Sequence, residues 1–254
     1  MADNQDALLQ DKGTVRAVDR ALDVLLCFRT KDELGLTEIS KMIGLHKSTV
    51  HRLLATLETR GFVRREQSDR YRIGWSILEL TSGIYRSGDF STVVFPEMTA
   101  LRDRIGETVS LYVRSGFERI RIQAVEGIHA VRRVANIGMR FPLHIGASGK
   151  VLLAFCNEPL LDRMESAGAL PNNFNKAEFE RQLEDIRKRG YAVTFEEREA
   201  GAAAVAAPIM NRQNQVSAAL SVSGPVDRFS EANLERFIVA CVDSANLIGK
   251  VFPF

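Results

Sequence analysis

The sequence predicts an α+β protein in two parts, and three observations lead to that prediction. Three helical segments and a basic β-hairpin occupy residues 14–74. A single helical segment, residues 75–90, follows as a linker helix. Over residues 91–254, helices are segregated from alternating apolar and polar runs, which is typical of a mainly antiparallel sheet flanked by helices. Residues 1–13 carry no such pattern and are predicted to be a disordered tail.

Composition and charge exclude several classes of protein. The 254 residues carry a net charge of only +2, so a nucleic-acid partner must be argued from local charge. No apolar stretch reaches the roughly 18 residues that a membrane span needs, and the acidic N-terminus does not resemble a signal peptide. We therefore expect a cytoplasmic protein without a membrane partner. Cys27, Cys156 and Cys241 lie in apolar segments, where a free cysteine usually behaves as a small buried hydrophobe.

The first helix is predicted over residues 14–29 from apolar residues at helical spacing. Those residues are Val15, Val18, Leu22, Leu25 and Leu26. The polar segment KDELG then ends it. A second, short helix is predicted to begin at Thr37, whose hydroxyl could accept from an exposed backbone N–H, and to end at Gly44.

The third helix is predicted from Lys47 to Arg60, with Gly61 as its terminator. One stripe of this helix is apolar, because four residues fall at helical spacing. They are Val50, Leu53, Leu54 and Leu57. Residues 62–66 (FVRRE) and 70–74 (RYRIG) then read as two strands joined by the turn QSD, which predicts a hairpin.

This order of helix, short helix, turn, helix and hairpin is that of a winged helix-turn-helix, three helices with a β-hairpin wing. In this motif the second helix of the pair enters the major groove of DNA. The apolar stripe of the third helix must face its own domain, which leaves its polar residues outward. From Thr37 to Trp75 the chain has eight Lys or Arg against four Asp or Glu, a local net charge of +4. Hairpin arginines would meet phosphates, which supply affinity more than sequence choice.

The predicted DNA-binding residues are Thr37, Lys47, Ser48, Thr49, His51, Arg52, Arg64 and Arg70. Arg52 can reach guanine acceptors, and the Ser48 and Thr49 hydroxyls can serve bases or phosphates. The alternative is an ordinary helical bundle with a solvated basic face. A charged helix alone would favour that alternative, whereas its combination with a short helix, a Gly44 turn and a basic hairpin favours DNA.

In the second domain, the sequence order of elements predicts the sheet. A helix (about 92–105) precedes two alternating strands within residues 108–125, and PLHIGASGKVLLAF passes from a strand through a small-residue loop into a helix. A charged amphipathic helix then ends at Gly190. Three strand candidates follow, YAVTF, AAVAAPIM and QVSAALSVSG, and a long helix behind Ser230 as N-cap closes the chain.

Several of these segments together resemble one known family. LTEISKMIGLHKSTVHRLLATLETRGFVRREQSDRYRIGWSILEL resembles the winged-helix domain of the isocitrate lyase regulator (IclR) family, and VRAVDRALDVLLCF resembles its first helix. GETVSLYV, FPLHIGASGKVLLAF, RKRGYAV, EEREAG, VAAPI and AALSVSGP continue the resemblance in the family's order over nearly the whole chain. The resemblance implies a GAF-like effector-binding domain, a homodimer or tetramer (a dimer of dimers), and control of nearby catabolic genes.

The GASGK loop is a candidate effector site. Ala147, Ser148 and Gly149 have little side chain, so backbone N–H groups at a helix start could approach an anion closely. The loop is not a phosphate-binding P-loop, because His144 and Val151 stand where that motif needs Gly and Ser or Thr. The residues alone leave a tight strand-to-helix turn equally open. The resemblance favours contact with a carboxylate or other small ligand.

Three further residues are predicted to bind the effector. Glu197 lies in a cluster of acids that could also be a solvated turn, and the resemblance implies an acidic contact near it. Ser221 and Ser223 alternate with Val222 and therefore share one face of a strand, where they could bind ligand or only neighbouring backbone. Many members of the family have a larger polar pair where this chain has Ala203 and Ala204. A roomier, less polar site that accepts an aromatic metabolite is the resulting hypothesis.

We therefore predict a DNA-binding regulator whose binding to a double-stranded operator is modulated by a carboxylate or aromatic effector. The main rival is an enzyme, but the sequence has no G-x-S-x-G elbow and no H-E-x-x-H, so no catalytic residue and no cofactor are assigned. The second rival is a DNA-binding dimer that needs no ligand. The four histidines show no metal-ligand spacing, so no metal site is assigned, and a metal bound in the pocket stays an open alternative.

Overall fold

The computed structural model describes residues 14–29, 31–85, 93–132 and 135–251, and the chain divides into two compact units, residues 1–86 and 87–254. The predicted tail over 1–13 and the last part of the predicted linker helix lie outside the described residues. No helix in the described part of the chain is long and apolar enough to cross a membrane.

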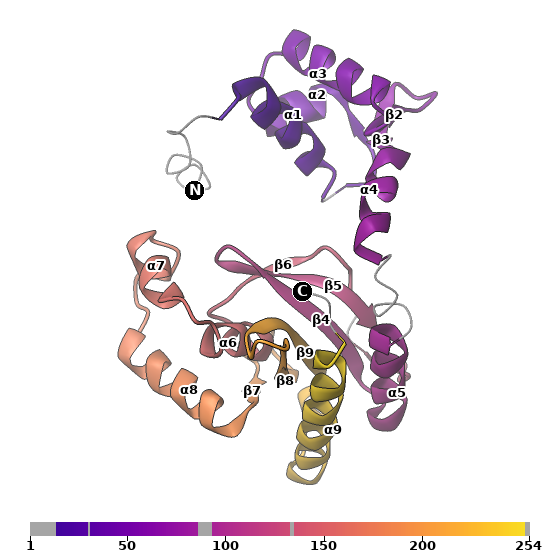
Figure 1. Cartoon of the computed structure of the whole chain (residues 1–254). Helices are drawn as coiled ribbons and strands as arrows, with labels where there is room; N and C mark the ends of the chain where they lie inside the picture. The colour runs from indigo at the N-terminus through magenta and orange to yellow at the C-terminus, as the bar shows by residue number, and fades with distance from the viewer. Residues whose placement is uncertain (1–13, 30, 86–92, 133–134, 252–254) are drawn as a thin grey trace. The chain divides into compact units, whose positions relative to one another are not determined.

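The first unit is a winged helix-turn-helix (Figure 1). Its elements are α1 (Arg16–Cys27), β1 (Leu34–Gly35), α2 (Leu36–Met42), α3 (Lys47–Thr59), β2 (Val63–Arg65), β3 (Arg70–Ile73) and α4 (Trp75–Tyr85). The hairpin β2–β3 is the predicted wing. Strand β1 pairs with β3 and makes a three-stranded antiparallel sheet in the order β1-β3-β2. It was not predicted, because two residues are too few to show an alternating pattern.

Helix α1 is apolar on two sides. Val24, Cys27 and Phe28 are buried in the core of the unit. Val18, Leu22 and Leu26, part of the series that predicts the helix, are each more than half exposed, as is Val15 just before it. These four residues therefore form an outward apolar stripe, whereas Leu25, the fifth member of the series, packs partly buried against the core.

Helix α2 begins one residue before the predicted cap, so the assignment of Thr37 as N-cap is wrong. Gly35 holds the N-cap position and Thr37 is the second residue of the helix, with an exposed side chain. The backbone N–H of Gly35 donates to Glu38 Oε2 at 2.9 Å. Glu38, the third residue of the helix, thus provides the acceptor for the backbone N–H of the N-cap residue.

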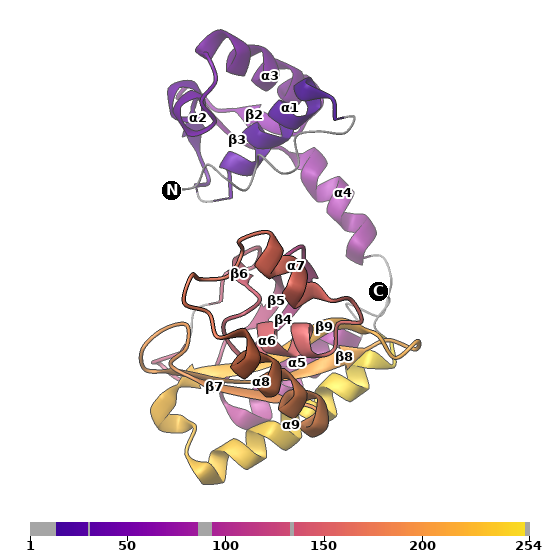
Figure 2. The same ribbon diagram turned by 90° about the vertical axis from the view of Figure 1, so that its left-hand side faces the viewer.

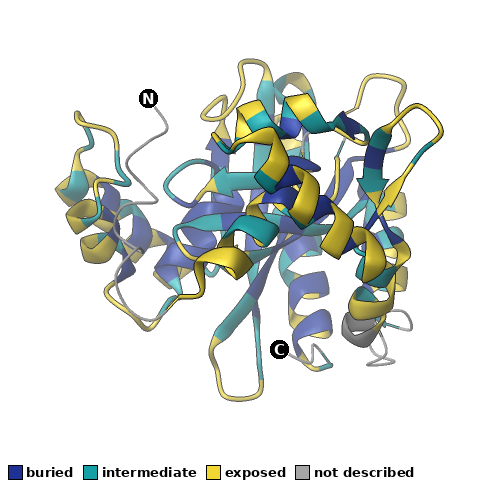
Figure 3. Cartoon of the chain, turned by 90° about the horizontal axis from the view of Figure 1, so that it is seen from above, coloured by how far each residue is buried: buried dark blue, intermediate teal, exposed yellow. Residues whose placement is uncertain are grey.

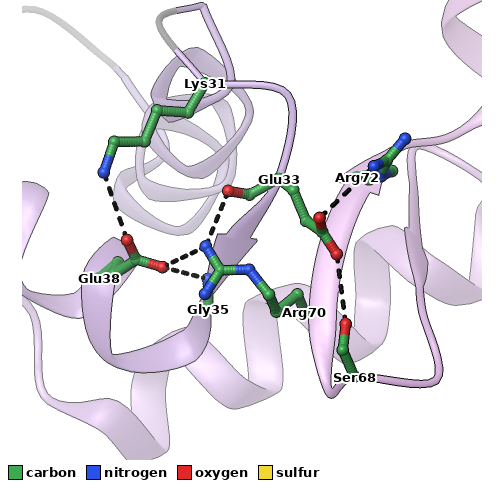
Figure 4. A network of polar contacts seen from close by, with 7 residues as sticks. All are labelled: Lys31, Glu33, Gly35, Glu38, Ser68, Arg70 and Arg72. Carbon is green, nitrogen blue, oxygen red and sulfur yellow. Dashed lines mark hydrogen bonds and ion pairs between the residues drawn. The ribbon is translucent and has the colours of Figure 1, made fainter.

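Glu38 also ties the wing to the helix pair. Arg70 Nη2 on β3 pairs with Glu38 Oε2 at 2.7 Å and donates to the backbone oxygen of Glu33 at 3.0 Å. Lys31 pairs with Glu38 from the other side at 3.3 Å, and Arg72 pairs with the Glu33 carboxylate at 3.4 Å (Figure 4). The network fixes β3 against the start of α2.

The second unit is an antiparallel sheet with helices on both faces (Figures 1 and 2). Its elements are α5 (Phe95–Ile105), β4 (Thr108–Ser115), β5 (Glu118–Val125), β6 (Arg140–Pro142), α6 (Ala147–Ala154), α7 (Leu160–Ser166), α8 (Lys176–Arg189), β7 (Ala192–Phe195), β8 (Ala202–Met210), β9 (Val216–Pro225), the 3-10 turn η2 (Val226–Arg228) and α9 (Glu231–Gly249). The strand order is β6-β5-β4-β9-β8-β7, and every neighbouring pair is antiparallel. The predicted α+β fold class is confirmed.

Two hydrophobic cores lie on the two faces of this sheet. Helices α5 and α9 pack on one face against β4, β8 and β9. Helices α6, α7 and α8 cover the other face, and buried residues follow the strands and the inner faces of the helices (Figure 3). Helix α7 was not predicted. The strand before the GASGK loop ends at Pro142, earlier than expected, so residues 143–146 form the turn into α6.

Candidate nucleic-acid interface and ligand cavity

The two faces of α3 are separated as predicted. Val50, Leu54 and Leu57 are buried, and Leu53 packs partly buried against them. On the opposite face the side chains of Lys47, Ser48, His51 and Arg52 are exposed, and Thr49 is half-buried. The polar face of this helix is therefore open within its own unit.

The start of α3 is shaped by His46, which sequence reasoning did not select. His46 is the N-cap, and its Nδ1 accepts from the backbone N–H of Ser48 at 3.4 Å. The same nitrogen lies 2.8 Å from Ser48 Oγ. When Nδ1 carries no proton, the Ser48 hydroxyl donates to it and its oxygen is left to accept from a base or a backbone donor. The signal in the sequence was His46 directly before the first residue of the helix.

The two wing arginines assigned to DNA differ in their surroundings. Arg64 is exposed, 3.2 Å from Glu66 and 5.8 Å from the centre of the Trp75 ring. Arg70 is half-buried and takes part in the network with Glu38 and Glu33. Exposed ion pairs are weak and exchange readily, so Arg64 can turn to a phosphate. Arg70 would first have to leave Glu38.

The second unit contains a cavity between the α6 face of its sheet and the loop after β7. Its volume, counted with the open mouth, is about 440 Å³. Its wall is formed by Tyr112, Arg119, Gly146, Ala147, Ser148, Thr194, Glu197, Arg198, Glu199, Ala202, Ala203, Ala204, Ser221 and Ser223. Five of the six predicted effector residues are among these, and Gly149 is not.

The two serines share a face of β9, as their alternation predicts. In the ladder, Ser223 lies opposite Ala204 and Ser221 opposite Ala206. Ser221 Oγ donates to the backbone oxygen of Val205 at 3.1 Å, so this hydroxyl is already engaged in part. Of the alanine pair, Ala204 belongs to the α6 face, whereas Ala203 packs in the core with α9. Of the two positions, only Ala204 can therefore make the site substantially wider than a larger side chain would.

The GASGK loop is a tight turn packed on a buried arginine. A Cβ on Gly149 would lie 2.2 Å from the Leu143 oxygen, and one on Gly146 would lie 3.2 Å from Arg119 Nη2. Gly146 also has a φ of 80°, in the left-handed region. These glycines are therefore required by close packing, which accounts for Gly149 without any ligand.

Two backbone N–H groups at the start of α6 already have side-chain partners. Gly146 N donates to Glu197 Oε2 at 2.9 Å, and Ala147 N to Thr194 Oγ1 at 3.2 Å. The other Glu197 oxygen pairs with Lys150 Nζ, which also contacts Gln182 at 3.0 Å. Glu197 thus caps the helix that was expected to bind an anion.

Two arginines at this site were missed. Arg119 and Arg121 on β5 are only 2% and 4% exposed. Burial lowers the pKa of Arg119 to about 10. The signal was the alternation in ERIRI: because Ile122 packs on the α5–α9 core, Arg119 and Arg121 must point to the opposite face, which the helices cover.

His144 lies beside this cluster. Its ring packs edge-on against Phe174, with centroids 5.9 Å apart, and its Nδ1 is buried without a hydrogen-bond partner. Burial, and then the charge of Arg119, lower the pKa of His144. Within the described residues, no three or more His, Cys, Asp or Glu side chains gather in a way that could hold a metal.

Residues 17–67 match the IclR helix-turn-helix domain, and residues 84–250 match the C-terminal region of the bacterial transcriptional regulator IclR. The HTH-type transcriptional regulator XynR of Escherichia coli K12 is 35% identical over 230 residues, 88% of this chain and 91% of that protein. The transcriptional repressor IclR of the same organism is 30% identical, over 92% of this chain and 88% of that protein.

Solved structures agree with these matches. An IclR transcriptional regulator from Alicyclobacillus acidocaldarius has a TM-score of 0.82 at 29% identity, and the match covers 93% of this chain and 98% of that one. An IclR homolog from Microbacterium hydrocarbonoxydans, in complex with 4-hydroxybenzoate, has a TM-score of 0.80 at 23% identity, over 92% of this chain and 98% of that one, which supports the fold alone. The two proteins compared by sequence are named as transcriptional regulators, not as enzymes.

Proposed function

This chain belongs to the IclR family of bacterial transcriptional regulators, and from that premise we propose that α3 reads a specific operator while a small organic effector in the cavity of the second unit modulates that reading. The observation that carries the DNA half of the proposal is the separation of faces on α3. Its apolar residues are buried in their own unit, and Ser48, Thr49 and Arg52 lie on the opposite face.

The chemistry of this face suits a major groove. Arg52 offers the donors that guanine accepts, and Ser48 and Thr49 offer short hydroxyls near the helix start, where the recognition helix approaches base edges. We assign phosphate contacts to Lys47 and Arg64, whose basic side chains are exposed. We propose that the base-contacting residues of α3 determine which sequence is bound, whereas Lys47 and Arg64 add affinity through phosphates.

A homodimer or a tetramer is part of the proposal. Val15, Val18, Leu22 and Leu26 form an exposed apolar stripe on and just before α1, and Trp75 and Leu78 are exposed on α4. Such surfaces are usually covered by a partner. We propose a second copy of this chain as that partner, because a palindromic operator needs two recognition helices related by a twofold axis.

The effector half of the proposal rests on the cavity. Its wall mixes hydroxyls, charges and small apolar side chains, the combination that orients a small polar ligand. The solved Microbacterium hydrocarbonoxydans homolog holds a small aromatic acid. Ligand occupancy would shift the population of chains competent to bind the operator.

A selection from random duplexes tests the DNA half. We expect the purified chain to enrich one palindromic sequence at fixed salt. Arg52→Ala should weaken binding to that sequence by about 1–3 kcal/mol and binding to an unrelated duplex much less. Arg181→Ala, an exposed arginine on α8, removes the same charge and should match the wild type. Failure of the wild-type chain to bind any duplex, even at low ionic strength, would overturn this half.

A further inference from the structure

The cavity wall contains a buried arginine, Arg119, and a second buried arginine, Arg121, lies two residues further along β5. In the part of the chain that the structure describes, no carboxylate lies within ion-pair distance of Arg119 or Arg121. Arg119 Nη1 donates to the backbone oxygen of Pro142, and its Nε is buried without a partner. A buried cation without an acid partner is costly, and proteins usually pair such groups.

We propose that Arg119 is the residue that selects an organic carboxylate as the effector, with the Tyr112 hydroxyl as a second donor. The inference rests on the proposed function, because it names the chemical class of ligand for the same cavity. Both Arg119 and Tyr112 line that cavity. An Arg–carboxylate pair is charge-assisted and stronger than a hydrogen bond between neutral groups.

At the start of α6, the other candidate for holding the carboxylate, two backbone N–H groups are already bound within the protein. Gly146 N and Ala147 N donate to Glu197 and Thr194. Glu197 also pairs with Lys150, so its carboxylate is bound at the helix start, and it attracts Arg119 without forming an ion pair with it. A ligand carboxylate arriving there would meet the carboxylate of Glu197 and be repelled. Of the two arginines in the cavity wall, Arg198 is exposed, whereas Arg119 is buried and its Nε has no hydrogen-bond partner.

Arg121 positions Tyr112 as a donor. Arg121 Nε and Nη2 both donate to Tyr112 Oη, at 3.0 and 2.7 Å. With two N–H groups on its oxygen, the phenol has its own O–H left to donate. The ring centres of Tyr112 and Phe141 lie 5.3–5.5 Å from the guanidinium carbons of both arginines, a distance at which an aromatic face attracts a cation.

The experiment compares acids with their neutral amides on the full chain. Acetate, lactate, gluconate and benzoate, each beside its primary amide, are added at constant ionic strength while the melting temperature is recorded, and calorimetry gives Kd for the compounds that stabilise. The variants are Arg119→Gln, Arg119→Lys and Tyr112→Phe. Arg114→Gln is the matched control, because Arg114 lies opposite Arg119 in the sheet and already pairs with Glu158. Circular dichroism checks that each variant folds.

We expect at least one acid to stabilise the wild-type chain more than its amide does. Arg119→Gln should weaken that acid by at least about 20-fold, Arg119→Lys by less, and Tyr112→Phe by about three- to tenfold, with Arg114→Gln unchanged. Tyr112→Phe and Arg119→Lys keep the bulk of the side chain, so they remain informative if Arg119→Gln does not fold.

Three results would overturn the inference: no acid of the set stabilises more than its amide, an amide binds as tightly as its acid, or Arg119→Gln and Arg119→Lys leave the acid's Kd unchanged. Operator affinity, measured in parallel, separates this failure from that of the proposed function. If a neutral amide binds and changes operator affinity, the regulator proposal stands and Arg119 is not the selecting residue. If an acid binds through Arg119 and operator affinity does not change, the inference stands and effector control fails.

Discussion

The carboxylate of Glu197 accepts a hydrogen bond from the backbone N–H of Gly146 at 2.9 Å, and the two residues are 51 positions apart in the chain. Through this bond the loop after β7 closes over the start of α6. The other oxygen of Glu197 pairs with Lys150, one turn into the same helix. Glu197 is therefore a cap as well as part of the cavity wall.

Replacing Glu197 by Ala should destabilise the second unit. The change leaves the Gly146 N–H without its acceptor and the nearly buried Lys150 ammonium with only Gln182, so we expect a loss of about 1–3 kcal/mol in the free energy of unfolding. Urea denaturation measures it. Glu180→Ala, on the exposed face of α8, should change stability by less than about 0.5 kcal/mol. Equal stability of the two variants would show that the cap contributes nothing.

Arg64 and Arg70 should separate phosphate binding from structure. Arg64→Ala should weaken binding to all duplexes alike and lower the slope of log K against log salt by about one. Arg70→Ala should mainly lower the melting temperature, because it breaks the pair with Glu38. Binding titrations over a salt series, with thermal melts, measure both. A drop in the salt slope for Arg70→Ala without a change in melting temperature would make Arg70 a phosphate contact instead.

Leu22→Glu tests the apolar stripe of α1. A charge in the middle of a buried subunit interface should dissociate it, so we expect sedimentation velocity to show a smaller species than for the wild type. Met42→Glu, on α2, places the same charge at another half-exposed apolar residue of the unit and should keep the wild-type assembly. An unchanged sedimentation coefficient for Leu22→Glu would remove α1 from the interface.

Patterns within one element were predicted well from the sequence, and contacts between elements were not. The period of α3 places Val50 and Leu57 inside and Arg52 outside, because a helix has only one way to bury such a stripe. The alternation of Ser221 and Ser223 likewise fixes their common face. The N-cap of α2 was missed because Gly35 has no side chain that could signal a helix start, and only the folded chain shows that Glu38 reaches the N–H of Gly35.

The anion site shows the same limit. A glycine-rich helix start suits an anion in general, but here Glu197 arrives from another part of the chain and occupies it. Arg119, the residue that we propose for the effector carboxylate, lies on a strand whose sequence pattern suggests a half-exposed position, and it is buried only because helices cover that face of the sheet. Only the folded structure shows that the start of α6 is bound by Glu197 and that Arg119 has no ion-pair partner among the described residues.

His144 should make stability depend on pH. Its pKa is lowered in the folded protein by burial and by Arg119, whereas in the unfolded chain it returns to the ordinary value of 6.5. Below that value the unfolded state binds more protons than the folded state, so the free energy of unfolding should fall as the pH drops through and below 6.5. Urea denaturation at a series of pH values measures the slope. His144→Gln should reduce it, and an identical slope in that variant would assign the dependence to other groups.

The most direct test is the operator Kd of the wild-type chain with and without the compound, acid or amide, that most raises its melting temperature, at one salt concentration. The account predicts a change of about five- to 150-fold, a coupling of roughly 1–3 kcal/mol between cavity and recognition helix. The same operator Kd at saturating compound would contradict it, because the cavity and the DNA-binding face would then be energetically independent.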